Sequence, residues 1–462
     1  MDARLNSWWL GALSLLVALM PLSFSVSWHV KALPALLLLI AGLGLLLRNA
    51  GVRNSYREAW PVFAVCALSV LYTALNIFGH RLGWNAFDLP SHILLYMVTA
   101  AVFSQPLRMR WVWMGFSITA IALGGVCIQQ HFLMGIDRAF GLNGGDWGAI
   151  EFAMVMLVLS LIGWVQLFYS RGHFAEKAMH GLGAISGMYG AMLTQSRGPL
   201  LAFVPVLLLL LLIYARRTHR WGHVLLMLVA IVGGGALAAG TVHNVSIPPT
   251  AVAQPASTET TTWAAQPSAP AKPAVTASTP PSPTSSAPVF VKRFADVGSE
   301  MTSYNSKTDA RGAVRERLEM WHTAGHAFMD HPLAGVGIDQ FGVFARQQVA
   351  QGNANAAIAK YEHPHNEYLE AAATGGVPGL LVIVLIFAVP LGYFARHALH
   401  AQDSGIIPSS VGVAIVSMYA LCGLTDNVFY RAMPHSMYFF SVLGLAALLS
   451  RMKLSKEIAL RV

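Results

Sequence analysis

Two short motifs hold the side chains of this chain that are best suited to chemistry on an anionic substrate. The first is Gln195-Ser196-Arg197-Gly198-Pro199, between two apolar runs, and the second is His363-Pro364-His365-Asn366, just before another apolar run. An arginine side chain presents a planar fork of donors that fits phosphate oxygens, and it keeps its charge. A histidine side chain titrates near neutral pH and can accept a proton from a hydroxyl group. The pairing indicates an enzyme more than a transporter.

Each motif also has a structural interpretation. Ser196 and the following helix N-terminus would add donors and a positive dipole for an anion bound by Arg197. Alternatively, Arg197 extends its charge into water from a tight turn at a membrane surface. In the second motif, Asn366 could orient a histidine ring or a substrate hydroxyl, whereas a histidine at a membrane interface is often structural. The sequence alone leaves both interpretations open.

Other polar residues are weaker candidates. His322, His326 and Asp330 are spaced i, i+4, i+8, which is compatible with a metal site. Zinc needs a third good ligand and ordered groups that orient its ligands, so a polar helix face is the better interpretation. Asp137-Arg138 and Asp426–Arg431 flank predicted outer loops, either as local ion pairs or as lining of the same cavity. We predict no bound metal and no cofactor.

Composition places these motifs on a membrane protein. Hydrophobic residues make up 55% of the chain and charged residues 11%. In hydrocarbon every backbone polar group must be satisfied internally, so apolar runs of about 20 residues predict spanning helices. We predict an all-α integral membrane protein with twelve spans. These cover residues 8–22, 30–47, 59–78, 88–105, 111–128, 147–169, 178–195, 199–214, 222–243, 371–395, 405–425 and 434–450.

The distribution of Lys and Arg predicts the orientation of the spans. With a cytoplasmic N-terminus, one set of connections and the two termini hold sixteen Lys and Arg, against five in the short connections opposite. This asymmetry agrees with the positive-inside rule and puts both motifs on the outer face. The net charge of +9 therefore reports topology, and we predict no nucleic-acid partner.

One long polar segment, residues 244–370, interrupts the apolar pattern on the predicted outer side. Its part 247–288 is rich in Pro, Ala, Ser and Thr with almost no charge, which predicts a disordered linker. Its part 311–360 has the pattern of a helical lid. The chain thus divides into spans one to nine over 1–243, this external loop, and spans ten to twelve with a cytoplasmic tail over 371–462.

The lid pattern consists of two amphipathic helices. Apolar residues at spacings of three and four predict a first helix, which Pro332 ends. These residues are Val314, Leu318, Trp321, Gly325 and Phe328. After a turn at Gly335-Val336-Gly337, Phe341 begins a second helix that Asp339 is expected to cap. We expect both helices to lie on the outer membrane face over a cavity.

These motifs resemble those of the bacterial O-antigen ligases and their relatives, the O-antigen polymerases and protein O-oligosaccharyltransferases. The ligases typically show an Arg followed four positions on by Leu, which fits Arg197 and Leu201. They also show His then Asn, Ser or Gln, nine residues, and Gly-x-x-Gly. His365-Asn366 and Gly376-Val377-Pro378-Gly379 fit this second pattern.

The resemblance extends to the span pattern and the external loop. Relatives commonly share an Arg shortly before a Trp in that loop, which falls on Arg317 and Trp321, and a turn like that at Gly335-Val336-Gly337. The linker over 247–288 departs from the family, which should affect loop mobility more than chemistry. The resemblance implies a GT-C-like membrane fold.

It also implies a reaction: transfer of a glycan from undecaprenyl diphosphate to a sugar hydroxyl of lipid A–core, at the periplasmic face of a bacterial inner membrane. Arg197 and Arg317 would neutralise the diphosphate leaving group, since no Asp-x-Asp occurs on the predicted outer side. His365 would position or deprotonate the acceptor hydroxyl for direct displacement with inversion, with His363 as the reserve candidate. Further substrate-binding candidates are Ser196, His363, Asn366, Arg138 and Arg431.

Other activities stay open. A polymerase would use the same donor and residues with a second lipid-linked glycan as acceptor. A protein O-oligosaccharyltransferase usually carries a further C-terminal soluble region, which we do not expect after the twelfth predicted span. A transporter or flippase needs polar residues deep within its spans, and the predicted spans hold few, such as Asn76 and Gln166.

Overall fold

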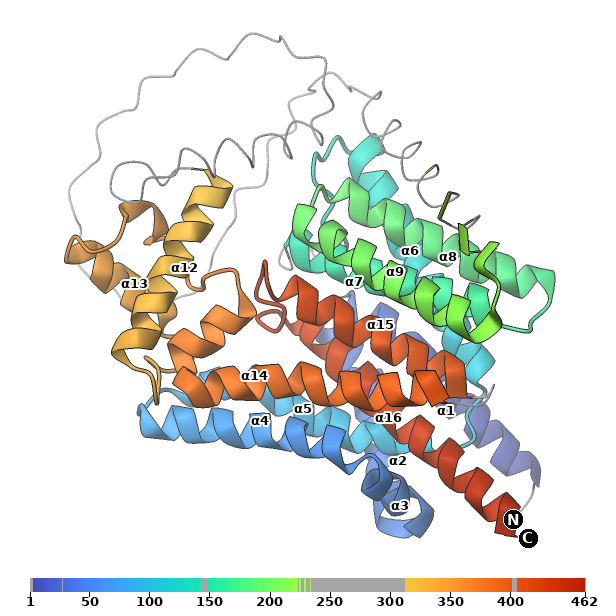
Figure 1. Cartoon of the computed structure of the whole chain (residues 1–462). Coiled ribbons are helices and arrows are strands. Elements are labelled where there is room, and N and C mark those ends of the chain that lie inside the picture. Colours follow the sequence, from blue (N-terminus) through green and yellow to red (C-terminus); the bar gives the residue numbers. More distant parts are fainter. Residues whose placement is uncertain are drawn as a thin grey trace.

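The described part of the protein is a bundle of helices. The structure is a computed structural model that describes residues 3–26, 28–142, 148–222, 224–225, 228–229, 233, 312–400 and 405–461. Over these ranges the secondary structure is helical, without a β-strand (Figure 1). The all-α fold class is therefore confirmed for the residues that the structure describes.

Eight helical segments of the described ranges are long and apolar enough to cross a membrane. They are α1 (Ala3–Phe24), α4 (Trp60–Gly79), α5 (Asp88–Thr99) with the flanking turns η1 (Trp84–Phe87) and η2 (Ala100–Ser104), α6 (Met109–Ile128) with η3 (Gln129–Leu133), α7 (Ala149–Tyr169), α9 (Arg197–Thr218), α14 (Glu367–His400) and α16 (Ala432–Arg461). A ninth span is possible if α2 (Trp28–Arg48) and α3 (Ala50–Glu58), bent by 98°, count as one. The chain is thus a multi-pass membrane protein.

The prediction of twelve spans is not confirmed. Helices α8 (Phe174–Leu193) and α15 (Ile406–Cys422) form where the seventh and eleventh spans were predicted. Helix α8 has Glu176, Lys177 and His180 in its first two turns, and α15 has 17 residues, fewer than the roughly 20 needed to cross. Most of the predicted span 222–243 lies outside the described residues, as does the predicted linker 247–288.

Helices α7 and α16 lie at the centre of the bundle. Of their most apolar windows, 83% and 94% of the residues are buried, whereas the windows of the other spans are 39–56% buried. Helix α8 packs closely on α7 because a Cβ on Gly187 would come within 2.6 Å of the Met156 carbonyl oxygen. Small residues at such contacts let membrane helices approach each other. This core fixes the ends of the helices that carry the two motifs.

The two predicted lid helices are present as α12 (Ala313–Asp330) and α13 (Phe341–Ala350). They share a small apolar core to which Met320 of α12 and Phe341 of α13 both contribute. The predicted cap of α13 is wrong, because its N-cap residue is Gln340, without a side-chain cap bond. Asp339 instead takes a left-handed backbone conformation one residue earlier, with φ of 60°. The covering role of these helices stays a prediction.

A break in α14 joins the lid helices to the membrane helices. Gly376 has φ of 62° and interrupts the helix, and the Val377 N–H there donates to the Pro332 carbonyl at 2.7 Å. The Gly337 N–H donates to the Thr374 carbonyl at 3.0 Å. From α4, Asn76 accepts the Ile338 N–H through Oδ1 at 3.0 Å. The 332–338 segment therefore satisfies backbone groups that the break would otherwise leave unpaired.

Candidate functional site

Helix α12 holds the His-Pro-His segment in place just before α14. The Trp321 indole N–H donates to the Pro364 carbonyl at 3.0 Å. Glu316 of the same helix accepts from the Tyr361 hydroxyl and from Lys360 Nζ, the latter at 3.2 Å. In the turn after α13, the Asn355 N–H donates to Glu319 Oε1 of α12 at 2.8 Å. The segment is therefore anchored from the same helix that carries Arg317.

Asn366 connects this segment to the loop between α15 and α16. Its Oδ1 accepts the N–H groups of Tyr368 and Leu369, both at 3.0 Å, which caps the first turn of α14. Its Nδ2 donates to the Leu424 carbonyl at 3.0 Å, and its backbone N–H donates to Asn427 Oδ1 at 3.1 Å. The side chain is buried and engaged within the protein. A contact between Asn366 and substrate stays a prediction that these bonds do not support.

The α15–α16 loop places a carboxylate against His365. Nδ1 of His365 and Oδ1 of Asp426 are 2.8 Å apart. The Asp426 side chain keeps 7% of its surface exposed and that of His365 keeps 22%, so one edge of the imidazole stays reachable. Burial raises the pKa of Asp426, but the hydrogen bond and charge of His365 and the charge of Arg317 lower it more, so its pKa lies below its ordinary value. Asp426 is therefore a carboxylate that can accept Nδ1–H and leave Nε2 as a base.

The backbone at His365 is strained. Its φ is 51°, in the left-handed region that non-glycine residues seldom adopt. Such conformations persist where the surrounding structure holds them, often at functional sites. In the first motif, Gln195 has a φ of 53° just before Ser196 and Arg197. Each motif thus contains one strained residue within two positions of the start of a helix, Gln195 before α9 and His365 before α14.

His363 lies beside His365 but has different surroundings. Its ring centroid lies 4.6 Å from that of His365 and 4.3 Å from that of Tyr430. Its Nδ1 is buried without a hydrogen-bond partner among the described residues. Burial, and after it the neighbouring His365, lower the pKa of His363 to about 4. His363 is therefore neutral at neutral pH.

The first motif meets the second through the α15–α16 loop. Pro199 from α9, Glu151 from α7 and Asp426 line one small cavity. A Cβ on Gly198 would lie 2.6 Å from Thr425 Oγ1, so the start of α9 touches the residue before Asp426. Gly198, next to Arg197, thus contacts Thr425, next to Asp426, and Asp426 in turn contacts His365.

The other predicted residues lie around this junction. Ser196 Oγ donates to the Ala149 carbonyl at 3.0 Å and accepts from Arg138 Nη2 at 3.3 Å, so both hold the start of α9. Arg138 also donates through Nε to the Thr194 carbonyl at 3.0 Å. Nε of Arg431 lies 3.6 Å from Glu151 Oε1. Arg431 thus pairs with Glu151 of another helix.

One group of described residues has the geometry to hold a metal ion. The candidate ligand atoms of His363, His365 and Asp426 all lie within 4.8 Å of one another. Two imidazoles and a carboxylate form a ligand set that zinc accepts. His322 Nε2 and His326 Nε2 on α12 are exposed and 3.3 Å apart, but among the described residues no third ligand joins them. The metal-free character of the site stays a prediction.

Sequence reasoning missed two members of the site. Asp426 and Glu151 carry no local motif, and their partners lie 61 and 280 residues away, respectively, at His365 and Arg431. Asp426 was predicted to flank an outer loop, in a local ion pair or as lining of the cavity, but not to pair with His365. An acidic residue at the predicted outer end of a span, within a cluster of aromatic residues, was the available signal.

Comparison with known proteins adds a family. Residues 182–384 match the family model described as O-antigen ligase, a range that contains both motifs, α12 and α13. Asp426, Arg431 and Glu151 lie outside that range. A protein of Haemophilus influenzae, described as an uncharacterized protein, is 21% identical over 328 residues, which are 70% of this chain and 69% of that protein. That similarity carries no activity with it.

Proposed function

We propose that the chain, whose residues 182–384 match the O-antigen ligase family model, transfers a glycan from undecaprenyl diphosphate to a sugar hydroxyl of lipid A–core. The reaction takes place at the periplasmic face of a bacterial inner membrane, where both lipid substrates present their head groups. Support comes from the positive-inside charge pattern and from the junction of the two motifs at one end of the helix bundle (Figure 1).

His365 is the base in this proposal. Its Nδ1 donates to the Asp426 carboxylate, so Nε2 accepts the proton of the acceptor hydroxyl as that oxygen attacks the anomeric carbon. The new C–O bond forms as the bond from this carbon to the diphosphate oxygen breaks, which inverts the configuration. The carboxylate stabilises the imidazolium that forms. His363 is the weaker candidate because the described residues give it no orienting carboxylate.

Two arginines take up the charge of the leaving group. Arg317 lies close enough to Asp426 for its charge to lower the pKa of that carboxyl, which puts it near the reacting end. Arg197 is the first residue of α9, beside Gly198 at the contact with Thr425. A guanidinium at each place would hold the departing diphosphate without proton transfer. The hydrogen bond between His365 and Asp426 is the single observation that carries the proposal.

The test is complementation of a strain that lacks this gene. Wild-type protein should restore O-antigen bands on lipopolysaccharide gels. Arg317→Ala should leave lipid A–core without O-antigen while lipid-linked glycan accumulates, at unchanged protein level. Arg346→Ala is the control. Arg346 of α13 is exposed and pairs with the exposed Glu362, and exposed ion pairs contribute little to stability.

Two results would contradict ligase activity. Core carrying a single repeat unit in the deletion strain would identify the protein as a polymerase, since ligation would still occur there. Normal lipopolysaccharide with loss of a glycoprotein band would identify a protein O-oligosaccharyltransferase.

A further inference from the structure

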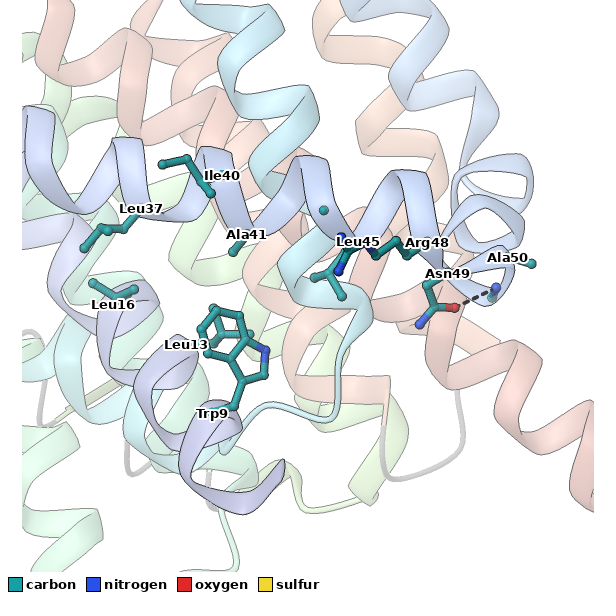
Figure 2. Close-up of a pocket in the computed structure, with 12 residues that line it drawn as sticks. Trp9, Leu13, Leu16, Leu37, Ile40, Ala41, Leu45, Arg48, Asn49 and Ala50 are labelled. Carbon is teal, nitrogen blue, oxygen red and sulfur yellow. Dashed lines mark hydrogen bonds between the residues drawn. The ribbon is translucent and has the colours of Figure 1, made fainter. Parts of the chain in front are cut away.

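A groove of about 820 Å³ lies between α1 and α2, away from the site described above. Figure 2 shows Trp9, Leu13 and Leu16 of α1 on one side and Leu37 and Ile40 of α2 on the other. This volume is in the range of pockets that hold small ligands. The wall is apolar along its length, and polarity increases only at Arg48 and Asn49, where α2 ends.

The groove opens at the end of the bundle opposite the two motifs. Arg108, at the start of α6, donates to the Ser7 carbonyl at 3.2 Å beside the first turns of α1. The other end of α6 leads to Gln130, which donates to the Gly141 carbonyl at 2.6 Å, close to the start of α7. The positive-inside pattern assigns the Arg48 end to the cytoplasm.

Arg48 is the charge at this end of the groove. The groove is lined without an Asp or Glu residue, and no hydrogen bond or ion pair of the Arg48 side chain occurs among the described residues. A second groove on the other face of α1 also ends at an arginine, Arg110, but Glu176 pairs with it at 2.8 Å. The two grooves therefore differ in that only the first offers an uncompensated cation to an anion.

Helix α3 sets the depth of this cation in the membrane. It leaves α2 at 98°, and Asn49 caps it through Oδ1, which accepts the Gly51 N–H at 2.9 Å. Val52 and Ser55 face the protein, while Arg53 and Arg57 are exposed. An amphipathic helix with basic residues on its polar face lies in the plane of the head groups. Arg48 is thus at head-group level, with the apolar groove extending into the hydrocarbon.

We propose that this groove binds an anionic glycerophospholipid, with an acyl chain along Leu13 and Ile40 and its phosphate on Arg48. The guanidinium gives charge-assisted hydrogen bonds to phosphate oxygens. Basic pockets between membrane helices on the cytoplasmic side recognise anionic head groups in this way. Trp9 lies at the same end, where aromatic side chains prefer the membrane–water interface.

The test is lipid titration of the purified full chain by native mass spectrometry. Wild-type protein should bind phosphatidylglycerol in preference to phosphatidylcholine. Arg48→Gln should weaken phosphatidylglycerol binding about fivefold, the factor expected for one basic residue at a membrane surface, and remove the preference. Arg57→Gln, an exposed arginine of α3 that does not line the groove, should bind like wild type.

A second pair of variants tests the groove itself. Gly44 lines it, and a Cβ there meets no atom within 4 Å, so Gly44→Leu should fold and fill the space. That variant should lose the bound lipid, whereas Gly125→Leu, at an equally open position on α6, should keep it. Equal affinity of Arg48→Gln and wild type would overturn the proposal. A wild-type dimer that becomes monomeric in Gly44→Leu would also overturn it, because a second copy would then occupy the groove.

Discussion

Replacing Asp426 by Asn tests whether the carboxylate acts through His365. The two residues are joined at 2.8 Å, and the pKa of Asp426 lies below its ordinary value, so wild-type protein presents a carboxylate that accepts Nδ1–H. An asparagine amide donates a hydrogen bond to Nδ1 instead. The imidazole proton then moves to Nε2, which can no longer accept a proton from the acceptor hydroxyl.

The size of the effect follows from the role of the base. General-base help is worth about 10²–10⁴-fold in rate, or about 2.7–5.4 kcal/mol at 1.36 kcal/mol per tenfold. In the Ser-His-Asp triad the same change of tautomer costs about 10⁴-fold. Folding should survive, because asparagine has the shape of aspartate. Oδ1 of Asp426 also accepts the Asn427 N–H at 2.9 Å, so turning the amide NH2 toward Nδ1 costs that one hydrogen bond, about 1 kcal/mol.

The assay is transfer of lipid-linked glycan to lipid A–core by purified protein, with kcat and KM measured separately. Asp426→Asn should lower kcat with little change in KM for the donor. Asp330→Asn, an exposed acid on α12, should leave both constants unchanged. In the double variant, Asp426→Asn should cost nothing further once His365→Ala has removed the imidazole.

Two results would refute this reasoning. Full activity of Asp426→Asn would show that the carboxylate does not set the tautomer. Losses that multiply in the double variant would show that Asp426 acts by a route independent of His365.

Four further predictions concern the surroundings of the site. In wild type the pKa of His363 is about 4 in the folded chain and 6.5 in the unfolded chain, so the unfolded chain takes up the proton first as the pH falls. The free energy of unfolding therefore decreases between pH 6.5 and 4, by up to about 3 kcal/mol. His363→Asn should remove this decrease. Parallel melting curves of the two proteins would contradict this. Asn76→Ala should lower the free energy of unfolding by about 1–3 kcal/mol, because the Ile338 N–H loses its acceptor, whereas the exposed Asn353→Ala should not. Reporter fusions after Arg57 should signal cytoplasm and those near Arg431 the outside, and the reverse pattern would put the site on the wrong face. Transfer by purified protein should persist with chelator present, and a strict metal requirement would reassign the two histidines and Asp426 as ligands.

Local patterns predicted the presence of α12 and α13 correctly. Apolar spacings of three and four in 314–328 correspond to α12, and the Gly335-Val336-Gly337 turn forms where expected. That turn needs glycine, because a Cβ on Gly335 would lie 2.2 Å from the Thr374 carbonyl carbon. Such features depend on residues close in sequence, so the sequence contains the whole signal.

Long-range pairing was beyond sequence reasoning. Periodicity tells which face of a helix is buried but not which residue it meets, so Asp426 could not be assigned to His365. Asn366 was expected near a substrate hydroxyl, but its side chain caps α14 and binds the Leu424 carbonyl. Short polar side chains before a helix serve both purposes, and only the position of the neighbouring loop distinguishes them.

The residues of the site come from distant parts of the chain, so they are synthesised at different times. Arg197, Arg317 and His365 emerge before Asp426, and the break at Gly376 needs both the earlier 332–338 segment and Asn76 of α4. Non-local contacts of this kind form late, because the chain must close large loops first. The proposed centre is therefore complete only when the α15–α16 connection has formed, so a chain still being made lacks the carboxylate that is proposed to orient its base. A nascent chain that stalls or is truncated after α14 would be inert toward the lipid-linked glycans around it.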